Sequence, residues 1–350
     1  MYPNELNYKM PAEWAEHDRT LISWPVQSSM CYPEDYEAVC LGYAEIIKAI
    51  TEFEPVTIVV NSTDAKKVSC LFHNVQIKYL EIEHNDSWIR DNGPTFIFNE
   101  EGEVAGVNWK FNAWGGKYAP WDLDDQIACQ VLRHFGIECF DAPLVMEGGS
   151  FHVDGEGTLI TTEECLLNPN RNPELTREQI ENELKKILNI DKVIWLKNGL
   201  DGDETDGHVD NIACFAAPGK ILMQVCNDQY DKNYAITREN LKVINSETDA
   251  LGRKFKIIPI QQPPQMFHNN KRLTLSYLNF YFVNGGIILP VFGGQAQGTD
   301  RLAVEILSEV FSQRRVRTVN GMLIINEGGN VHCMTQQMPM GRKKGYICEK

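Results

Sequence analysis

One short pattern recurs along this chain: a polar or glycine-rich segment, a strand-like run, a glycine turn and a second strand-like run. A glycine turn between two such runs indicates a β-hairpin. Repeats of this kind are typical of radial or stacked architectures. About five hairpin-plus-helix units fit into the chain, so we expect one α/β domain over residues 1–350. The turns fall at Gly102, Gly155, Gly219 and Gly285, at intervals of 53, 64 and 66 residues.

Apolar residues at helical spacing predict a helix in each of four segments. Thr176 is expected to cap the third of these helices, because Glu178 and Gln179 follow it, and Asp300 is expected to cap the fourth. Short buried strands are expected at 19–25 and 55–61. The four helical segments are 33–53, 122–136, 173–190 and 300–311.

The chain is acidic, with a formal charge of −15. This charge disfavours nucleic acid and anionic membranes as partners and favours a small cationic ligand, although it also simply aids solubility. No segment reaches the roughly 18 apolar residues of a membrane span, and the first residues do not resemble a signal peptide. The ten cysteines include no CxxC pair, so we expect reduced thiols in the cytoplasm and no structural zinc.

The polar segments that precede the hairpins carry most of the chemically reactive residues. If the repeated units surround one axis, these segments meet at one place. Residues from distant parts of the chain are therefore expected to line one pocket. The residues concerned are Asp91, Glu147, His208, Asp210, Asn279 and Cys333.

In DSWIRDNGP, residues 86–94, Asp91 stands at the entrance of an Asn-Gly-Pro turn. Asp91 can serve this turn alone by accepting hydrogen bonds from its N–H groups, with Arg90 as a surface charge. The nearby Trp88 favours a binding role instead, because a tryptophan face can stack on a planar cation.

The segment GDETDGHVDN, residues 202–211, carries four carboxylates and one histidine. A solvated acidic loop would explain the charges alone. However, the segment leads directly into an apolar strand, and on a strand His208 and Asp210 would face the same side. We therefore expect this pair to belong to a site. A metal site is the weaker interpretation, because the segment has no second histidine.

The segment GGNVHCMTQQMP, residues 328–339, places Cys333 after a glycine-rich turn. A single cysteine is more often a buried inert thiol than a nucleophile. Here the glycines allow close approach of the backbone, and a thiolate with a remote histidine is a known nucleophilic arrangement. Adjacent residues on a strand point to opposite faces, so His208 rather than His332 is the expected partner of Cys333.

These groups together suit one kind of chemistry. Carboxylates bind a guanidinium through its planar N–H fork. A thiolate can attack the guanidinium carbon, and the bound cation helps to keep the thiolate ionised. His208 would protonate the departing amine and then deprotonate the water that attacks the covalent thiouronium. The products would be ammonia and a urea.

Several long motifs resemble those of the agmatine deiminase family, a branch of the guanidine-modifying superfamily that also contains arginine and peptidylarginine deiminases. The resemblance extends over nearly the whole chain. It implies the pentein fold, an α/β propeller of five ββαβ units around a pseudo-fivefold axis. The motifs are MPAEWAEHDRTLISWP, WIRDNGPTF, FNAWGGKYAPWDLDDQ, EGGSFHVDGEGTLITTEECLLNPNRNP, GDETDGHVDN, NFYFVNGGIILPVFG and GGNVHCMTQQMP.

The resemblance also implies an activity and a site. Members hydrolyse agmatine to N-carbamoylputrescine and ammonia, need neither metal nor organic cofactor, and are usually homodimers or larger homo-oligomers. By motif, the nucleophile is Cys333, the catalytic histidine is His208, and Asp91 and Asp210 bind the guanidinium. The expected substrate-binding residues are Trp88, Trp114, Glu147, Glu204, Asp206 and Asn279.

Two features depart from the family pattern. The segment around 261–275 is shorter than usual, and Glu327 stands where the family often has glycine. A shortened loop beside the pocket would alter access or specificity rather than the chemistry.

Other functions remain open at this level. Deimination of arginine or peptidylarginine would need a cation for the substrate's carboxylate or backbone, and amidino transfer to an amine would use the same catalytic residues. A non-enzymatic amine binder would be expected to lack one of the four catalytic residues, and all four are present. The candidates for the carboxylate-binding cation are Arg90, Arg171 and Lys117, and a metallohydrolase would use His152, His208 and His332 with nearby acids.

Overall fold

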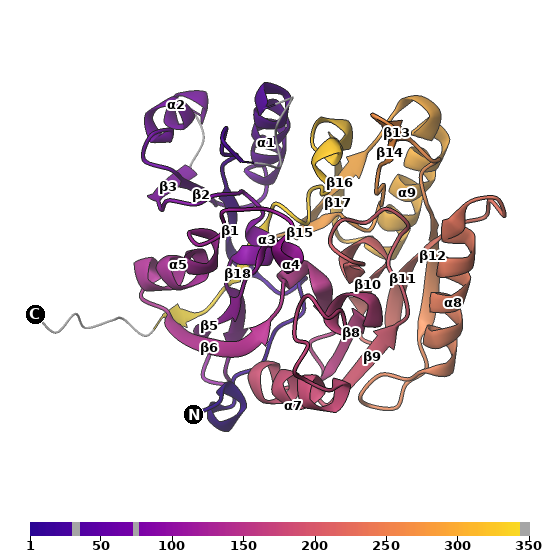
Figure 1. Cartoon of the computed structure of the whole chain (residues 1–350), viewed down its shortest axis with the longest axis horizontal. Helices are drawn as coiled ribbons and strands as arrows, with labels where there is room; N and C mark the ends of the chain where they lie inside the picture. Colours follow the sequence, from indigo (N-terminus) through magenta and orange to yellow (C-terminus); the bar gives the residue numbers. More distant parts are fainter. Residues whose placement is uncertain (30–35, 73–76, 344–350) are drawn as a thin grey trace, which may run out of the picture.

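The computed structural model describes residues 1–29, 36–72 and 77–343. Within these ranges the strands form six separate sheets, and five of the sheets contain the same ββαβ unit. In each unit two antiparallel strands are followed by a helix and then by a strand parallel to the second strand. Figure 1 shows the long helices on the outside of these sheets. The predicted α/β repeat is therefore present, whereas the extent of a single domain stays a prediction.

Four of the units are continuous in the sequence. Their antiparallel strands are joined at the four predicted glycine turns, where φ is 73°, 76°, 70° and 73° in chain order. This is the left-handed region that glycine adopts without strain. The units are β4 (Thr95–Phe98), β5 (Glu103–Lys110), α5 (Ile127–Phe135) and β6 (Glu138–Val145); β7 (Phe151–Val153), β8 (Thr158–Thr162), α7 (Arg177–Leu188) and β9 (Lys192–Leu196); β10 (Ala213–Ala217), β11 (Lys220–Val225), α8 (Lys232–Ser246) and β12 (Lys256–Gln261); and β15 (Tyr281–Val283), β16 (Gly286–Val291), α9 (Gln297–Val310) and β17 (Arg315–Asn320).

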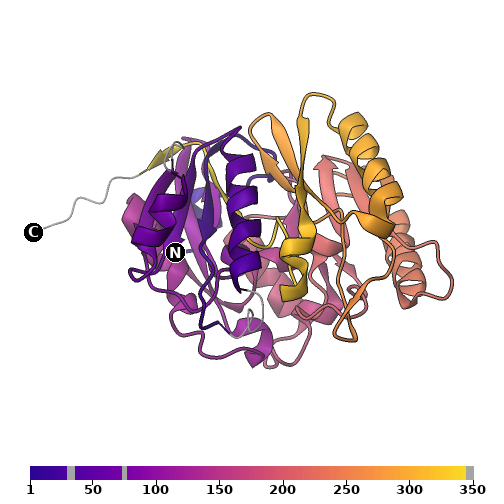
Figure 2. The ribbon, with the colours of Figure 1, turned by 90° about the horizontal axis from the view of Figure 1, so that it is seen from above.

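The fifth unit joins the two ends of the described chain. Strand β18 (Gln336–Pro339) lies antiparallel to β1 (His17–Ser23), which is followed by α1 (Tyr36–Ile50) and by the parallel strands β2 (Val56–Val60) and β3 (Ile77–Glu81). Figure 2 shows α1 beside the C-terminal segment that follows β17. This unit has no hairpin turn, because its two antiparallel strands come from opposite ends of the sequence.

The four predicted helices are confirmed as α1, α5, α7 and α9, although residues 33–35 of the first prediction lie outside the described residues. The Thr176 hydroxyl accepts a hydrogen bond from the backbone N–H of Gln179 and caps α7 as expected. The predicted cap at Asp300 is wrong, because α9 begins at Gln297. The Asp300 carboxylate instead accepts hydrogen bonds from the backbone N–H groups of Phe292 and Gly293, and it fixes the turn between β16 and α9.

Helix α8 was not predicted, and its buried face explains why. The buried positions of α8 include Asn233, Thr237 and Asn240, with Ile244 as the apolar member. Asn233 and Asn240 hydrogen-bond to neighbouring loops rather than packing as apolar side chains. A helix with a polar buried face lacks the apolar periodicity on which the prediction depends.

Shorter elements connect the units. The segment at 261–275, which we expect to be shorter than the family pattern, contains a small hairpin, β13 (Phe267–His268) paired with β14 (Lys271–Arg272). No helix of the described residues is long and apolar enough to cross a membrane. The remaining elements are α2 (Ala65–Ser69), α3 (Ile89–Asn92), α4 (Ala113–Gly116), α6 (Glu163–Leu166) and β19 (Arg342–Lys343).

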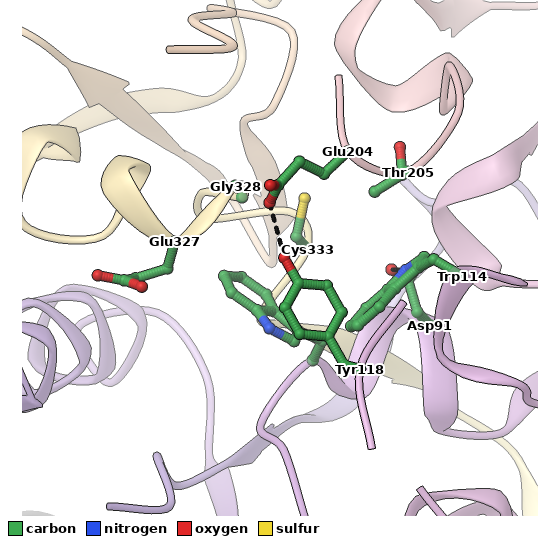
Figure 3. Close-up of a pocket in the computed structure, with 10 residues that line it drawn as sticks. Asp91, Trp114, Tyr118, Glu204, Thr205, Glu327, Gly328 and Cys333 are labelled. Atoms are coloured by element: carbon green, nitrogen blue, oxygen red, sulfur yellow. Dashed lines mark hydrogen bonds between the residues drawn. The ribbon is translucent and has the colours of Figure 1, made fainter. Parts of the chain in front are cut away.

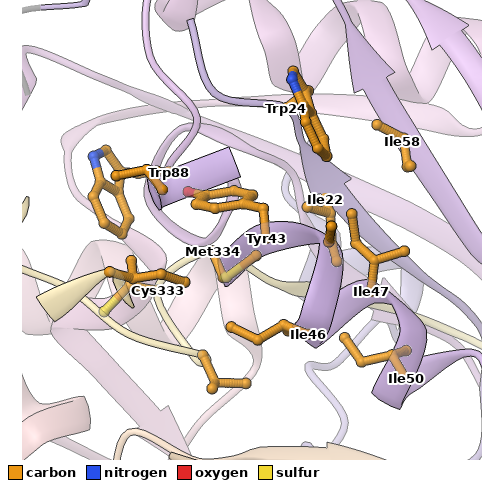
Figure 4. Close-up of a cluster of buried hydrophobic side chains, with 14 of the residues drawn as sticks. Ile22, Trp24, Tyr43, Ile46, Ile47, Ile50, Ile58, Trp88, Cys333 and Met334 are labelled. Carbon is orange, nitrogen blue, oxygen red and sulfur yellow. The ribbon is translucent and has the colours of Figure 1, made fainter. Parts of the chain in front are cut away.

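A large apolar cluster supports the C-terminal cysteine segment. Ile46 and Ile47 of α1 pack with Ile22 of β1, and the cluster extends to Cys333 and Met334 (Figure 4). Each fully buried isoleucine contributes about 1.5–3 kcal/mol relative to an exposed one. The backbone around Cys333 therefore packs against the apolar core and does not lie in an exposed loop.

Candidate active site

A pocket of about 350 Å³ opens above Cys333 (Figure 3). Two tryptophans and a tyrosine form aromatic walls, and acidic side chains stand among them. This mixture of flat apolar faces and carboxylates suits a planar organic cation. The lining residues are Trp88, Asp91, Trp114, Tyr118, Glu204, Thr205, Glu327, Gly328, Gly329 and Cys333.

Each of the five units contributes at least one polar residue just before its first strand. Asp91 precedes β4, Glu147 precedes β7, Asp210 precedes β10, Asn279 precedes β15 and Cys333 precedes β18. The structure brings these residues and His208 together, as the repeat predicted. The closest atom pairs are Cys333 Sγ and Asn279 Nδ2 at 3.1 Å, Cys333 Sγ and Asp210 Oδ2 at 3.4 Å, His208 Nε2 and Glu147 Oε2 at 3.7 Å, and His208 Nδ1 and Asp91 Oδ2 at 3.8 Å.

Cys333 lies in a turn rather than on a strand, so the strand argument that separated it from His332 is wrong. Its side chain is buried, and Gly329 lets Trp88 approach it: a Cβ atom at Gly329 would lie 2.5 Å from the Trp88 ring and 3.0 Å from Cys333 Cβ. Burial and the nearby Asp210 and Asp91 carboxylates raise the pKa of the Cys333 thiol well above its ordinary value. These surroundings therefore favour the thiol over the thiolate.

Gly149 is the point around which three site residues gather. A Cβ atom at Gly149 would lie 2.7 Å from His208 Nδ1, 2.9 Å from Asp91 Oδ1 and 3.0 Å from Asp210 Oδ2. The Gly149 N–H donates a hydrogen bond to Asp91 Oδ1 at 2.9 Å, and Trp114 Nε1–H donates to Asp91 Oδ2 at 2.9 Å. Only glycine leaves room for this arrangement, and the two donors fix the Asp91 carboxylate.

His208 is fully buried, and neither of its ring nitrogens has a hydrogen-bond partner among the described residues. Burial alone would lower the pKa of His208, but the Asp91 charge and the contacts with Cys165 and Glu147 raise it well above its ordinary value. The raised pKa favours the imidazolium form of His208, whose ring N–H groups have no hydrogen-bond acceptor among the described residues. It does not begin a strand as expected, because Val209–Asn211 form a short 3-10 turn, but it reaches the same site as Asp210.

Three of the six expected substrate-binding residues, Glu147, Asp206 and Asn279, are not among the lining residues. Glu147 is held by Arg171 Nε at 2.6 Å, and Asp206 by Arg171 and Lys117. Asn279 contacts Cys333 Sγ directly. Glu147, Asp206 and Asn279 therefore lie outside the pocket lining, where they contact other site residues. Trp88, Trp114 and Glu204 line the pocket itself.

Glu204 stands at the mouth of the pocket, where two other residues hold its carboxylate. Tyr118 O–H donates a hydrogen bond to Glu204 Oε2 at 2.9 Å, and Lys271 of the β13–β14 hairpin pairs with Oε1. The shortened 261–275 segment therefore reaches the pocket through Lys271.

Several site residues escaped the sequence argument. Tyr118 and Thr205 lie next to motif residues but carry no spacing signal of their own. In the sequence, Gly149 and Gly329 are each the second residue of a Gly-Gly pair, and Gly329 precedes the segment that carries Cys333. Glu13, which contacts His332 and Arg90, lies in the N-terminal segment and could not be placed without the tertiary structure.

A shared metal site for His152, His208 and His332 finds no support in the described residues. His152 and His332 both face Glu13, whereas His208 lies between Asp91 and Glu147. Within the described ranges, the groups of side chains close enough to share one ion contain neither His152 nor His332; these groups are Glu147 with Cys165 and His208, and Cys129 with Cys139 and Asp141.

The raised thiol pKa leads to a direct test. Asp210→Asn removes a negative charge beside Cys333, so the thiol pKa should fall and the alkylation of Cys333 by iodoacetamide at pH 8 should speed up about tenfold. Peptide mass mapping follows Cys333, and the exposed Cys70 thiol is the internal reference. An unchanged rate at Cys333 would show that the carboxylate does not control the thiol.

Comparisons with known proteins show the family of this chain. The model of the Porphyromonas-type peptidyl-arginine deiminase family matches residues 9–339. The agmatine deiminase of Stutzerimonas stutzeri is 43% identical over 363 residues, covering 96% of this chain and 97% of the relative, and that of Pseudomonas syringae pv. syringae is 42% identical over 372 residues, covering 97% and 98%.

Solved structures agree as well. The agmatine deiminase of Enterococcus faecalis superimposes with a TM-score of 0.91 at 35% identity, covering 97% of both chains. The C. jejuni agmatine deiminase with substrate bound gives a TM-score of 0.88 at 28% identity, covering 95% of this chain and 97% of the other. The predicted resemblance and the mixed α/β fold class are confirmed. The chain belongs to the Porphyromonas-type peptidyl-arginine deiminase family, with the fold of its agmatine deiminases.

Proposed function

We propose that this protein hydrolyses agmatine to N-carbamoylputrescine and ammonia. The observation that carries the proposal is a set of unused polar atoms beside the Cys333 thiol. Asp210 Oδ1 and both ring nitrogens of His208 are buried without hydrogen-bond partners among the described residues. Buried polar atoms are rarely left unpaired, because each costs about 1–3 kcal/mol. A guanidinium between Asp91 and Asp210 would satisfy the free acceptor and balance the carboxylates.

The bound cation would also prepare the nucleophile. Asp210 and Asp91 raise the thiol pKa, and a guanidinium paired with them offsets both charges. Cys333 then loses its proton to solvent, and its Sγ attacks the guanidinium carbon. Carboxylate pairing makes this carbon less electrophilic, so the aspartates serve to position and anchor the substrate rather than to activate it.

His208 supplies and takes up the protons in both half-reactions. As an imidazolium it donates a proton to the departing nitrogen, which leaves as ammonia, and Cys333 stays attached to the amidino carbon. Neutral His208 then takes a proton from a water that attacks this carbon. The C–S bond breaks as the hydroxyl group of the adduct loses its proton to solvent, the ureido product leaves and the Cys333 thiolate is restored. Glu147, fixed by Arg171, keeps His208 oriented and charged.

The three cations that could bind a substrate carboxylate are already paired with other groups, which favours agmatine over arginine as the substrate. Arg90 is buried and committed to Glu13, Gln337 and the His332 carbonyl oxygen. Arg171 is committed to Glu147 and Asp206, and Lys117 to Asp206 and the Glu204 carbonyl oxygen. The pocket is instead lined by Glu204 and Glu327, and Lys271 offsets the Glu204 charge only in part because both side chains are partly exposed, so this lining would attract the distal ammonium of agmatine rather than the carboxylate of arginine.

We further propose that the five units surround a pseudo-fivefold axis as a propeller. The shared strand order and the contribution of one polar segment per unit to one site support this arrangement. From the resemblance to the family we also propose that the protein is cytoplasmic, that it forms a homodimer or larger homo-oligomer, and that it acts without a metal or organic cofactor.

The proposed function is tested by comparing agmatine, arginine and a blocked arginine peptide as substrates, with ammonia and ureido product measured for each. Agmatine should be turned over fastest by far, and Cys333→Ser should abolish turnover while it preserves the circular dichroism of the fold. Preference for arginine or the peptide would refute the pocket assignment, and a fully active Cys333→Ser variant would refute the covalent mechanism.

Glu204 should contribute to recognition of the distal ammonium. Because its carboxylate is 30% exposed, solvent screens the charge, and we expect Glu204→Gln to raise KM for agmatine only about three- to tenfold. Butylguanidine, which lacks the ammonium, is the matched substrate and should show little change. An equal rise in KM for both compounds would place the effect of Glu204 elsewhere.

Gly149 should tolerate no side chain. A Cβ atom there displaces His208, Asp91 or Asp210 by a large fraction of an ångström, so Gly149→Ala should lower kcat/KM at least about 100-fold. Gly298→Ala is the matched control, because a Cβ atom at that helical position has no neighbour within 4 Å. Similar activity of the two variants would contradict the proposed crowding.

A further inference from the structure

A second buried charge network lies behind the site, and the mechanism above does not use it. The His332 ring stands between two carboxylates: Nδ1 lies 3.0 Å from Asp210 Oδ2, and Nε2 lies 2.9 Å from Glu13 Oε1. A carboxylate accepts hydrogen bonds, so each ring nitrogen must carry a hydrogen. A histidine with both nitrogens protonated is a cation. The geometry thus makes His332 an imidazolium at a depth where it is only 3% exposed.

Glu13 is the group that permits this buried cation. Arg90 Nη1 also contacts Glu13 Oε1 at 3.3 Å, and the other terminal nitrogen of Arg90 meets only the uncharged Gln337 side chain, at 2.9 Å. Without the Glu13 charge, Arg90 and His332 would face each other as two buried cations with Asp210 alone to balance them. Because the ring is more easily neutralised than a guanidinium, His332 would lose its proton.

The third contact of Glu13 differs in kind. His152 Nε2 lies 3.4 Å from Glu13 Oε2. On its other side, His152 Nδ1 accepts a hydrogen bond from the backbone N–H of Phe215 at 3.4 Å, so this nitrogen carries no hydrogen. His152 is therefore a neutral donor to Glu13, and it fixes the orientation of the carboxylate without adding charge.

This network orients the Asp210 carboxylate and keeps it ionised. Its Oδ2 atom is occupied by His332 and by the Cys333 thiol, which leaves Oδ1 as the free acceptor in the site. The His332 contact holds the pKa of Asp210 below its ordinary value despite complete burial. The titratable and charged groups around the network are His208, His332, Asp91 and Cys333 near Asp210; Asp210, Glu13 and Arg90 near His332; and His332, Arg90 and His152 near Glu13.

We propose that Glu13 and His332 form a positioning pair for Asp210, in which Glu13 keeps His332 cationic and His332 turns the ionised Asp210 toward the substrate. The second half of this statement rests on the proposed function, because it needs a guanidinium as the substrate. Neither residue touches the reacting atoms. Their effect reaches the reaction only through the charge and the orientation of Asp210.

The charge of His332 can be measured without any substrate. In ¹⁵N spectra of histidine-labelled protein, both ring nitrogens of His332 should be protonated at pH 7, and Glu13→Gln should lower the pKa of this ring by at least about one unit. His332→Asn identifies the signals. If the ring of His332 is already neutral at pH 7 in the unchanged protein, or if Glu13→Gln leaves its titration unmoved, the positioning pair does not exist.

The consequence for the site is measured with agmatine. Loss of the His332 charge raises the pKa of Asp210, so the acidic limb of kcat/KM should move to higher pH by about one unit or more in Glu13→Gln and in His332→Asn. In the Cys333→Ser background, calorimetry should show agmatine bound about tenfold more weakly by both variants.

Glu54→Gln is the matched control. Glu54 is also a buried carboxylate paired with a histidine, His17, at 3.0 Å, but His17 does not contact Asp210. Its pH profile and agmatine affinity should stay unchanged. A Glu13→Gln profile that matches Glu54→Gln would overturn the proposal. If the ¹⁵N result holds but Cys333→Ser binds no agmatine, the charge pair stands and the assignment of substrate fails.

Discussion

The structure of this site depends on how buried negative charge is balanced. Asp91, Asp210 and Glu147 stand around one imidazole in a volume from which water is largely excluded. A buried carboxylate costs several kcal/mol unless a cation or several donors face it. Arg171 balances Glu147 and His332 balances Asp210, whereas His208 lies between Asp91 and Glu147 without a hydrogen bond to either. Asp210 Oδ1 and both ring nitrogens of His208 are thus left without hydrogen-bond partners among the described residues, and a guanidinium between Asp91 and Asp210 would pair with the free acceptor.

Two of these carboxylates, Asp91 and Asp210, also explain why the Cys333 thiol keeps its proton. A thiol beside two carboxylates stays protonated and unreactive until a cation enters. A bound guanidinium therefore offsets the charges of Asp91 and Asp210, and by doing so it also lowers the pKa of the Cys333 thiol. The apolar cluster under Cys333 and the glycines at 149 and 329 hold these groups at the required distances, so little rearrangement is needed when the substrate binds.

The sequence predicted the repeat, its glycine turns and the convergence of the polar segments, because local turn chemistry and short periodicities determine these features. It did not predict the pairing of β18 with β1, which joins segments more than 300 residues apart, nor α8, whose buried face is polar. The strand geometry assumed for His208, Asp210 and Cys333 was wrong, since none of the three lies on a strand. Their proximity arises from the arrangement of the units. Glu13 lies in a motif that carries the family resemblance, but its role could not be found, because its partners His332, Arg90 and His152 are distant in sequence.

The most direct test of the account is to trap the covalent intermediate. The protein is mixed with agmatine, quenched with acid within milliseconds, digested and analysed by mass spectrometry. The account predicts an amidino group on the peptide that contains Cys333, formed before the ureido product and lost as that product accumulates. Turnover of agmatine with no modified Cys333 peptide, or with the amidino group on another cysteine, would contradict it.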